Sequence, residues 1–287
     1  MVDATLGLGG HTLAALEEFP QLRVIGLDRD PQALDIAQQR LSQFGNRVEC
    51  VLAVYDRIGE VLAERGLETV SAILFDLGVS SMQLDNVERG FSYSQSAPLD
   101  MRMNGTTGRS AADVVNTYSE VELTRILREY GEERFASRVA RAILRERQVE
   151  PFTTSDRLVD VIREAIPAAT RRTGGNPAKR TFQALRIEVN DELAVLERAI
   201  PSALDHLSVG GRIVVMSYHS LEDKIVKSAF RIGSELKTPA DLPFIPESDR
   251  PWLSLLTRGS EKASEEEINE NPRAASVRLR AAERVAA

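Results

Sequence analysis

Residues 3–11 read Asp-Ala-Thr-Leu-Gly-Leu-Gly-Gly-His and lie between a short apolar run and a helical pattern. The glycines let backbone N–H groups approach a ligand, and the start of the helix that follows favours negative charge. Asp28 ends the next apolar run, 21 residues after Gly7, where a carboxylate can accept both hydroxyls of a ribose. The glycine spacing is G-x-G-G, not the dinucleotide pattern G-x-G-x-x-G. The stretch also begins with an acid, Asp3. The stretch therefore favours S-adenosylmethionine over NAD, with a tight turn that binds no ligand as the alternative.

Apolar runs alternate with helical patterns through the first hundred residues. After the short apolar entry Val2–Thr5, the second, third and fourth expected strands are Val24–Asp28, Val48–Val51 and Val70–Asp76. Asp30-Pro31, between the second and third of them, is typical of a helix start. Alternation at this spacing predicts an α/β fold with a parallel, doubly wound, Rossmann-like sheet, in which ligands bind at the carboxyl ends of the strands.

The pattern changes after the fourth strand. Residues 104–110 form a polar, glycine-rich break, and 119–207 show only helical periodicity. Residues 212–217 form another buried-strand run, and 276–280 alternate like a closing edge strand. We therefore expect a discontinuous core built from residues 1–103 and 208–287. An inserted all-helical domain at 104–207 would divide this core and recognise the substrate.

The composition indicates a globular cytoplasmic protein without a membrane span. Of the 287 residues 43% are hydrophobic and 28% charged, and no apolar run approaches the ~20 residues that cross a bilayer. One Cys and three His argue against a disulfide and against a Cys/His zinc site, so we expect no metal. The net charge of −7 argues against a general nucleic-acid coat protein. Residues 128–186 nevertheless hold 13 Lys and Arg against 8 Asp and Glu, so this part is locally basic.

A second motif, Phe75-Asp-Leu-Gly-Val-Ser-Ser81, leaves the fourth strand at its carboxyl end. Asp76 and Ser80 are candidate catalytic residues, because both can accept hydrogens from an amino group. Ser80 or Ser81 could instead cap a helix.

A third motif, His219-Ser-Leu-Glu-Asp223, follows the fifth strand. Ser220 and Asp223 have the spacing of a capping box, which would make them structural. His219 is a candidate for contact with the substrate.

These motifs belong to a wider resemblance. The matching stretches, in order, are DATLGLGGH (3–11), GLDRDPQAL (26–34), DLGVSS (76–81), QLD (83–85), RGFSY (89–93), PLDMRM (98–103), YGEE (130–133), TFQALRIEVNDEL (181–193), SYHSLEDKIVK (217–227) and NPR (271–273). In these stretches the chain resembles the bacterial 16S ribosomal RNA cytosine-N4 methyltransferase family, called RsmH or MraW. The resemblance implies a class I S-adenosylmethionine-dependent methyltransferase core with an inserted helical domain. It also implies methylation of the N4 amino group of a decoding-region cytidine in 16S ribosomal RNA. The sequence leaves open whether naked RNA or a small ribosomal subunit is the substrate, and we expect the subunit.

The resemblance also assigns residues to the cofactor S-adenosyl-L-methionine. By motif position these are Gly9, Gly10, His11, Asp28, Tyr55, Asp76 and Gln83, with Tyr55 standing where the family usually has Phe. The cations that we expect to reach RNA phosphates are Arg102 and the group Arg171, Arg172, Lys179, Arg180 and Arg186, which brackets a glycine-rich loop. Exposed helix charge without a partner is the alternative for each of them.

Two other functions are compatible with parts of the pattern. An NAD-dependent oxidoreductase would use the same fold and the same acid at Asp28. A non-catalytic RNA-binding or ribosome-assembly factor is the other, because the family has an additional segment before its first strand and Met1 here stands almost at the glycine loop. We therefore expect that the start is truncated or assigned late. The sequence makes no prediction of the oligomeric state.

Overall fold

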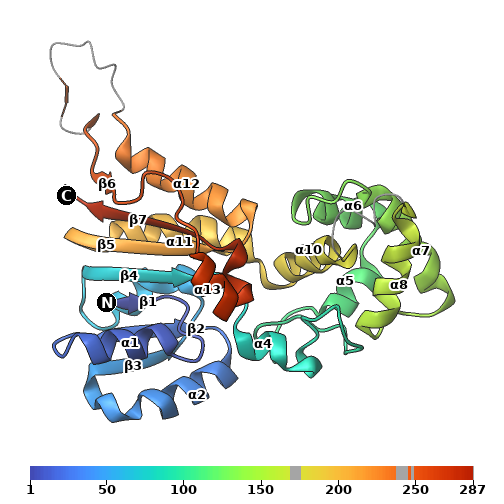
Figure 1. Cartoon of the computed structure of the whole chain (residues 1–287), viewed down its shortest axis with the longest axis horizontal. Helices are drawn as coiled ribbons and strands as arrows, with labels where there is room; N and C mark the ends of the chain where they lie inside the picture. Colours follow the sequence, from blue (N-terminus) through green and yellow to red (C-terminus); the bar gives the residue numbers. More distant parts are fainter. Residues whose placement is uncertain (169–175, 237–244, 247–248, 287) are drawn as a thin grey trace. The chain divides into compact units, whose positions relative to one another are not determined.

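The computed structural model describes residues 1–168, 176–236, 245–246 and 249–286. The chain forms two compact units, shown in Figure 1. The sheet unit combines Met1–Gly78 with Leu193–Ala287, and the helical unit is Val79–Glu192. Residues 79–103, which the sequence placed in the core, thus lie in the helical unit, and residues 193–207 lie in the sheet unit.

The sheet unit is built on seven strands in the order β3-β2-β1-β4-β5-β7-β6. The strands are β1 (Val2–Asp3), β2 (Val24–Asp28), β3 (Val48–Leu52), β4 (Val70–Asp76), β5 (Leu207–Ser217), β6 (Leu253–Leu255) and β7 (Arg278–Arg284). The first five are parallel, and β7 and β6 are antiparallel additions. The order reverses between β1 and β4, which is the topological switch point of a doubly wound fold. The α/β fold predicted from the strand–helix alternation is confirmed.

The strand expected at 276–280 occurs as β7, but it is not at the edge. Leu279 pairs with Met216 of β5 on one side, and Arg284 pairs with Leu253 of β6 on the other. The short strand β6 therefore forms the outer edge. Its three residues are too few to give a periodic signal, which is why the sequence did not indicate it.

Helices cover the sheet through two hydrophobic clusters. The helices of this unit are α1 (Gly10–Glu18), α2 (Pro31–Leu41), α3 (Ile58–Ala63), α11 (Glu192–Asp205, beginning at the unit boundary), α12 (Ser220–Ser234) and α13 (Glu265–Glu270). One cluster joins Leu16 of α1 and Leu41 of α2, and the larger one joins Leu62, Ile200 and Phe230 of α3, α11 and α12 to the strands. The helix start expected at Asp30-Pro31 is confirmed, because the Asp30 carboxylate accepts a hydrogen bond from the N–H of Gln32 at 3.1 Å.

The helical unit has its own hydrophobic core. Among its described residues the helices are α4 (Ser81–Asp85), α5 (Ala111–Thr117), α6 (Glu120–Glu129), α7 (Ala136–Val149), α8 (Ser155–Ala165) and α10 (Ala178–Asn190). Ile126 of α6, Ile143 of α7, Ile162 of α8 and Leu185 of α10 are fully buried against one another's helices. A unit of this kind folds around its own apolar contacts. Within the described ranges, no helix of the chain has the length and apolarity to cross a membrane.

Candidate functional site

The glycine loop joins β1 to α1 in the sheet unit. Gly9 caps the helix in the left-handed region, at φ 76° and ψ 22°, and a Cβ added there would lie 2.9 Å from Leu41 Cδ1. Glycine is therefore required at this position both by the backbone angle and by the close approach of α2. A Cβ on Gly10 would meet no atom within 4 Å. The first turn of α1 thus has open space beside it, where its N–H groups can meet a ligand.

A buried acid holds this loop in place. Asp3 is 1% exposed, and its carboxylate accepts hydrogen bonds from Thr12 Oγ1 at 2.7 Å and from the N–H of Thr5 at 3.3 Å. Burial raises the pKa of Asp3. The hydroxyl of Thr5 accepts a hydrogen bond from the N–H of Asp76 at 2.6 Å. These contacts tie the ends of β1 and β4 together. The sequence singled out Asp3 only as the first residue of the motif, and it gave no role to Thr5 or Thr12.

Asp28 connects the same loop to the end of β2. Its Oδ2 accepts a hydrogen bond from the N–H of Gly7 at 2.7 Å, and its Oδ1 accepts one from the N–H of Asp30 at 2.8 Å. Burial raises the pKa of this carboxyl group, although the residue keeps some exposure. Each carboxylate oxygen has a second lone pair, so the two backbone contacts leave acceptor capacity for ribose hydroxyls.

Tyr55 lies just beyond the end of β3, at the start of the short 3₁₀ helix Tyr55–Arg57. Its ring meets Phe75 of β4 edge-on, with centroids 5.6 Å apart and an interplanar angle of 83°. Phe75 is fully buried, whereas Tyr55 is partly exposed. The ring of Tyr55 is thus fixed by an aromatic neighbour, and it offers an apolar surface on which a planar base can pack.

Asp76 is the last residue of β4 and has contacts on both carboxylate oxygens. The hydroxyl of Tyr218 donates to Oδ1 at 2.8 Å, and His11 Nδ1 lies 3.7 Å from Oδ2. The side chain is 28% exposed, and burial raises its pKa. Burial, together with the charge of Asp76, also raises the pKa of Tyr218. Tyr218 was not predicted, although it immediately follows β5, the strand beside β4.

Together these groups suit an adenosine that carries a charged substituent. The loop and the four side chains Asp28, Tyr55, Asp76 and Tyr218 follow the carboxyl ends of β1, β2, β3, β4 and β5, which are neighbours in the sheet. In an open α/β sheet this edge is where ligands bind. The residues offer acceptors for ribose, a ring for the base and open space at the start of α1. They fit S-adenosylmethionine, as the sequence predicted.

Ser80 and Gln83 lie in the helical unit and form a reciprocal cap of α4. Ser80 Oγ accepts a hydrogen bond from the N–H of Gln83 at 3.3 Å, and Gln83 Oε1 accepts one from the N–H of Ser80 at 3.0 Å. The side chain of Gln83 is buried. The helix-capping alternative for Ser80 is therefore present in the structure. It leaves the Ser80 hydroxyl proton and one lone pair for another partner.

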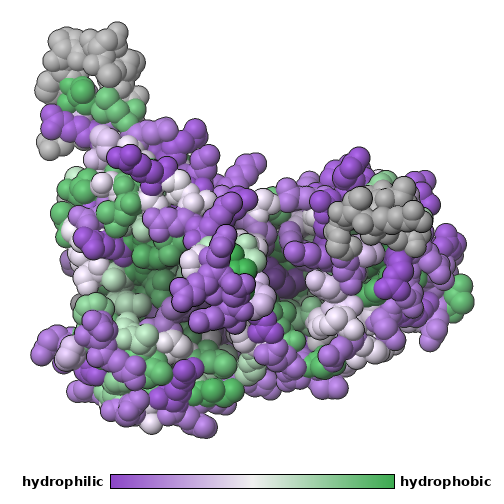
Figure 2. Space-filling view, in the orientation of Figure 1, coloured by the Kyte–Doolittle hydropathy of each residue, from purple (hydrophilic) through white to green (hydrophobic). Residues whose placement is uncertain are grey.

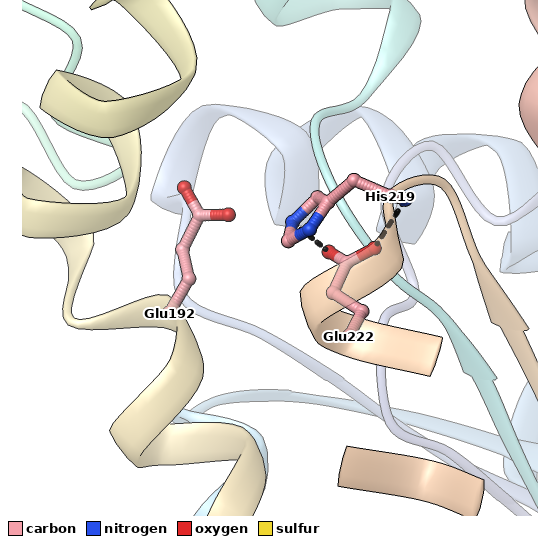
Figure 3. A group of neighbouring side chains, drawn as sticks. All are labelled: Glu192, His219 and Glu222. Atoms are coloured by element: carbon pink, nitrogen blue, oxygen red, sulfur yellow. Dashed lines mark hydrogen bonds and ion pairs between the residues drawn. The ribbon is translucent and has the colours of Figure 1, made fainter. Parts of the chain in front are cut away.

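The cap of α12 differs from the expected one. The predicted pair Ser220 and Asp223 is wrong, because the N-cap is His219 and the side chain that reaches back is Glu222. Glu222 Oε2 accepts from the N–H groups of Tyr218 at 2.8 Å and of His219 at 3.2 Å. Figure 3 shows these two side chains, with His219 Nε2 3.2 Å from Glu222 Oε1.

His219 and Glu222 are both well buried, with 10% and 4% of their side-chain surfaces exposed. An imidazole and one carboxylate supply fewer ligands than the three that a zinc site takes from a protein, so within the sheet unit we assign this pair to helix capping. Glu192, drawn in the same figure, forms an ion pair of 2.9 Å with Arg186 inside the helical unit.

The cations expected to reach RNA occupy different surroundings. Arg102 forms a bidentate ion pair with Asp100. The distances are 2.9 Å from Nε to Oδ1 and 2.7 Å from Nη2 to Oδ2. Lys179 and Arg180 are exposed in the first turn of α10, and Arg180 donates to the carbonyl oxygen of Glu132 at 2.8 Å. Arg171 and Arg172 lie outside the described residues.

Comparison with known proteins identifies a family for this chain. The profile of the MraW methylase family matches residues 1–285. A protein named ribosomal RNA small subunit methyltransferase H from Nocardioides sp. is 65% identical over 99% of this chain and 89% of its own length. Proteins of the same name from Parafrankia sp. and Frankia casuarinae are 62% and 63% identical over 100% of this chain, and over 88% and 89% of their own lengths. The chain therefore belongs to the MraW methylase family.

Proposed function

We propose that this chain transfers a methyl group from S-adenosyl-L-methionine to the N4 amino group of a cytidine in the decoding region of 16S ribosomal RNA. The observation that carries the proposal is the group of contacts around Asp76, an acidic acceptor at the end of β4 beside the glycine loop. Family membership supports it, and the relatives are named as methyltransferases of small-subunit ribosomal RNA. A family of methylases removes the support for an NAD-dependent oxidoreductase.

The residues of the sheet unit would hold the cofactor. Asp28 would accept the ribose hydroxyls with the lone pairs that Gly7 and Asp30 leave unused, and Tyr55 would pack beside the base. The backbone at Gly9 and Gly10 would come close to the cofactor, because these two residues have no side chain. When bound, S-adenosylmethionine supplies a methyl group activated by a sulfonium. What the protein adds is alignment, which is worth about 7–11 kcal/mol in well-oriented reactions.

The cytosine amino group is a poor nucleophile, because its lone pair is delocalised into the ring. An acceptor that holds an amino hydrogen favours the tetrahedral nitrogen of the transition state. Asp76 would be this acceptor, with Ser80 as a second one four residues along the chain. As the new N–C bond forms, the nitrogen gains positive charge and must release a proton, which the Asp76 carboxylate can take. Tyr218 and His11 keep that carboxylate oriented.

The target base has to leave any stack to reach such a site, which costs a few kcal/mol. A substrate held by the ribosome could present the nucleotide already unstacked, so we propose the assembled small subunit as the substrate. Lys179 and Arg180, both exposed, together with Arg102 and with Arg171 and Arg172 beyond the described residues, would contact RNA phosphates. His219 would support the reaction in one of two ways, either by capping α12 or by contacting the substrate.

Transfer of a labelled methyl group to small subunits that lack the modification tests this function, with mass spectrometric mapping of the product nucleotide. We expect one N4-methylated cytidine in the decoding region. Naked 16S RNA serves as the parallel substrate and shows whether the particle is needed. A chain that binds the RNA and is stabilised by S-adenosylmethionine but transfers no methyl group would be an assembly factor, and this result would refute the proposal.

A further inference from the structure

Three arginines form a stripe on the exposed side of α7. Arg138, Arg141 and Arg145 stand at spacings of three and four residues, which places them on one face of the helix. All three are exposed, while Val139 and Ile143 on the other side are fully buried in the core of the helical unit. Helix α7 therefore packs through its apolar side and presents guanidinium groups on its outer side.

The stripe borders a hollow between α7 and α8. The hollow has a volume of about 460 Å³ and is lined by Arg138, Arg141, Ala142, Arg145, Glu164 and Ala165. The lining thus holds three cations, one carboxylate and two alanines. Figure 2 shows that hydrophilic residues predominate on the visible face of the helical unit. A hollow with this lining favours a flat, anionic chain over an apolar ligand.

The fold does not depend on these three arginines. Arg138 makes no side-chain hydrogen bond or ion pair with any described residue. Arg141 lies 3.9 Å from Glu120 with 66% of its side chain exposed, and its Nε donates to the carbonyl oxygen of Ser137 at 3.2 Å, one turn earlier in the same helix. Arg145 pairs with Glu146 at 2.9 Å, on the surface. Such exposed pairs are worth about 0–1 kcal/mol, so an incoming phosphate can replace them.

Other arginines nearby behave differently. Arg147, also on α7, donates to the carbonyl oxygens of Val115 and Tyr118 at 2.9 and 2.7 Å. Arg157 of α8 donates to the carbonyl oxygens of Pro151 and Glu146, at 2.8 and 3.0 Å. These two arginines tie segments of the unit together. The contrast shows that the stripe is available for a partner, whereas its neighbours serve the fold.

We propose that the stripe and hollow of α7 and α8, in the helical unit, form a docking surface for the phosphate backbone of ribosomal RNA. The inference rests on the proposed function and names a contact surface for its substrate. From Arg138 to Arg145 the helix rises about 10 Å, which is the axial length of about three nucleotides in one strand of a duplex. Guanidinium groups bind phosphate oxygens through two parallel hydrogen bonds, which suits arginine better than lysine here.

The test is the triple variant R138E/R141E/R145E, compared with the wild type in binding to naked 16S RNA over a range of salt concentrations. We expect the affinity to fall at least about 10-fold, and the slope of log affinity against log salt to fall by about 2–3, because each lost phosphate contact removes close to one unit. The matched control is R23E/R231E/R258E, which changes three exposed arginines of the sheet unit and gives the same net charge. The control should keep most of the affinity and the full slope.

Binding of S-adenosylmethionine and the melting temperature separate this inference from the proposed function. Both should match the wild type in the triple variant, since the altered residues do not hold the fold and belong to the helical unit, whereas the glycine loop belongs to the sheet unit. Equal loss of affinity in the two triple variants would mean that only net charge matters, and would overturn the docking surface. Unchanged binding to naked RNA with weakened binding to the assembled subunit would assign the hollow to a ribosomal protein and would also overturn it. A wild-type chain that transfers no methyl group would refute the proposed function alone.

Discussion

Removing the hydroxyl of Tyr218 tests the role of Asp76 most directly. The hydroxyl donates to Asp76 Oδ1 at 2.8 Å, and this hydrogen bond lowers the pKa of Asp76, against the effect of burial, which raises it. Y218F deletes only the donor. The backbone N–H of Tyr218 still binds Glu222, and the ring still packs 3.6 Å from the position of a Cβ on Gly78.

The size of the effect follows from the hydrogen bond. A hydrogen bond to a charged group contributes about 1.5–3 kcal/mol, and 1.36 kcal/mol corresponds to one pH unit. Without it the ionised form of Asp76 is less favoured, so the carboxyl group keeps its proton to a higher pH. If the carboxylate accepts the amino proton, activity is lost on the acid side, and Y218F should move that acid limb about one unit upward. Its maximal rate at alkaline pH should change much less.

The assay is single-turnover methylation of small subunits over a range of pH, at saturating S-adenosylmethionine. Y118F is the matched control, because Tyr118 donates to Glu188 Oε1 at 2.6 Å inside the helical unit and its pKa is raised to about 12, first by burial. Y118F should lose comparable stability and keep the wild-type acid limb. Superimposable pH profiles for Y218F and the wild type, or equal shifts in both variants, would refute a role for Asp76 as proton acceptor.

Three further variants test separate parts of the structure. In G9A the left-handed backbone costs about 1–2 kcal/mol and the new methyl group meets Leu41, so isothermal titration should show weaker binding of S-adenosylmethionine; unchanged affinity would mean that the loop adjusts freely. D223A leaves the charges of Arg278 and Arg280 uncompensated and should cost about 3 kcal/mol in urea unfolding, a loss that should disappear in acid. S80A should cost about 1 kcal/mol as a lost helix cap and should also slow methyl transfer, whereas S80T should restore the cap; full turnover in S80A would limit Ser80 to capping.

The acid dependence of D223A follows from the sign of the pKa shift. Burial opposes ionisation of Asp223, but hydrogen bonds from Arg280 and Arg278 outweigh it and hold the pKa of Asp223 below its ordinary value. The carboxylate therefore stabilises the folded chain above the ordinary pKa of aspartate, and this contribution is lost as the pH falls through the lower pKa of the folded state. Wild type and D223A should approach equal stability there, and a constant difference at all pH values would contradict the ion pair.

Much of the fold and of the cofactor site could be predicted because the determinants are local. The apolar runs give β2 and β4, and their last residues, Asp28 and Asp76, meet at one edge because neighbouring parallel strands end together. The glycines at positions 9 and 10 mark the loop beside them. None of these predictions needs a contact between distant side chains. Tyr218 was missed because its partner Asp76 is 142 residues away in the sequence.

The helix cap at α12 shows why spacing alone can mislead. Ser220 and Asp223 have the residue types of a capping box, yet the helix uses the register one residue earlier. Two contacts explain this choice. Glu222 accepts the N–H groups of two successive residues, and Asp223 is bound by Arg280 of β7, a strand more than fifty residues later. A long-range ion pair thus removes the side chain that the local pattern would have assigned to the cap.

The same limit applies to charge. The window 128–186 has an excess of cations. The sequence alone does not show which of Arg138 and Arg147 is available for RNA, since both are arginines in one helix. Their positions differ by nine residues, two and a half turns, so they face different directions. Arg147 meets backbone carbonyl groups that need donors, and Arg138 meets solvent. An arginine that is already bound within the fold must give up a contact before it can bind RNA, so the exposed arginines that tie no segments together are the first place to look for a recognition surface.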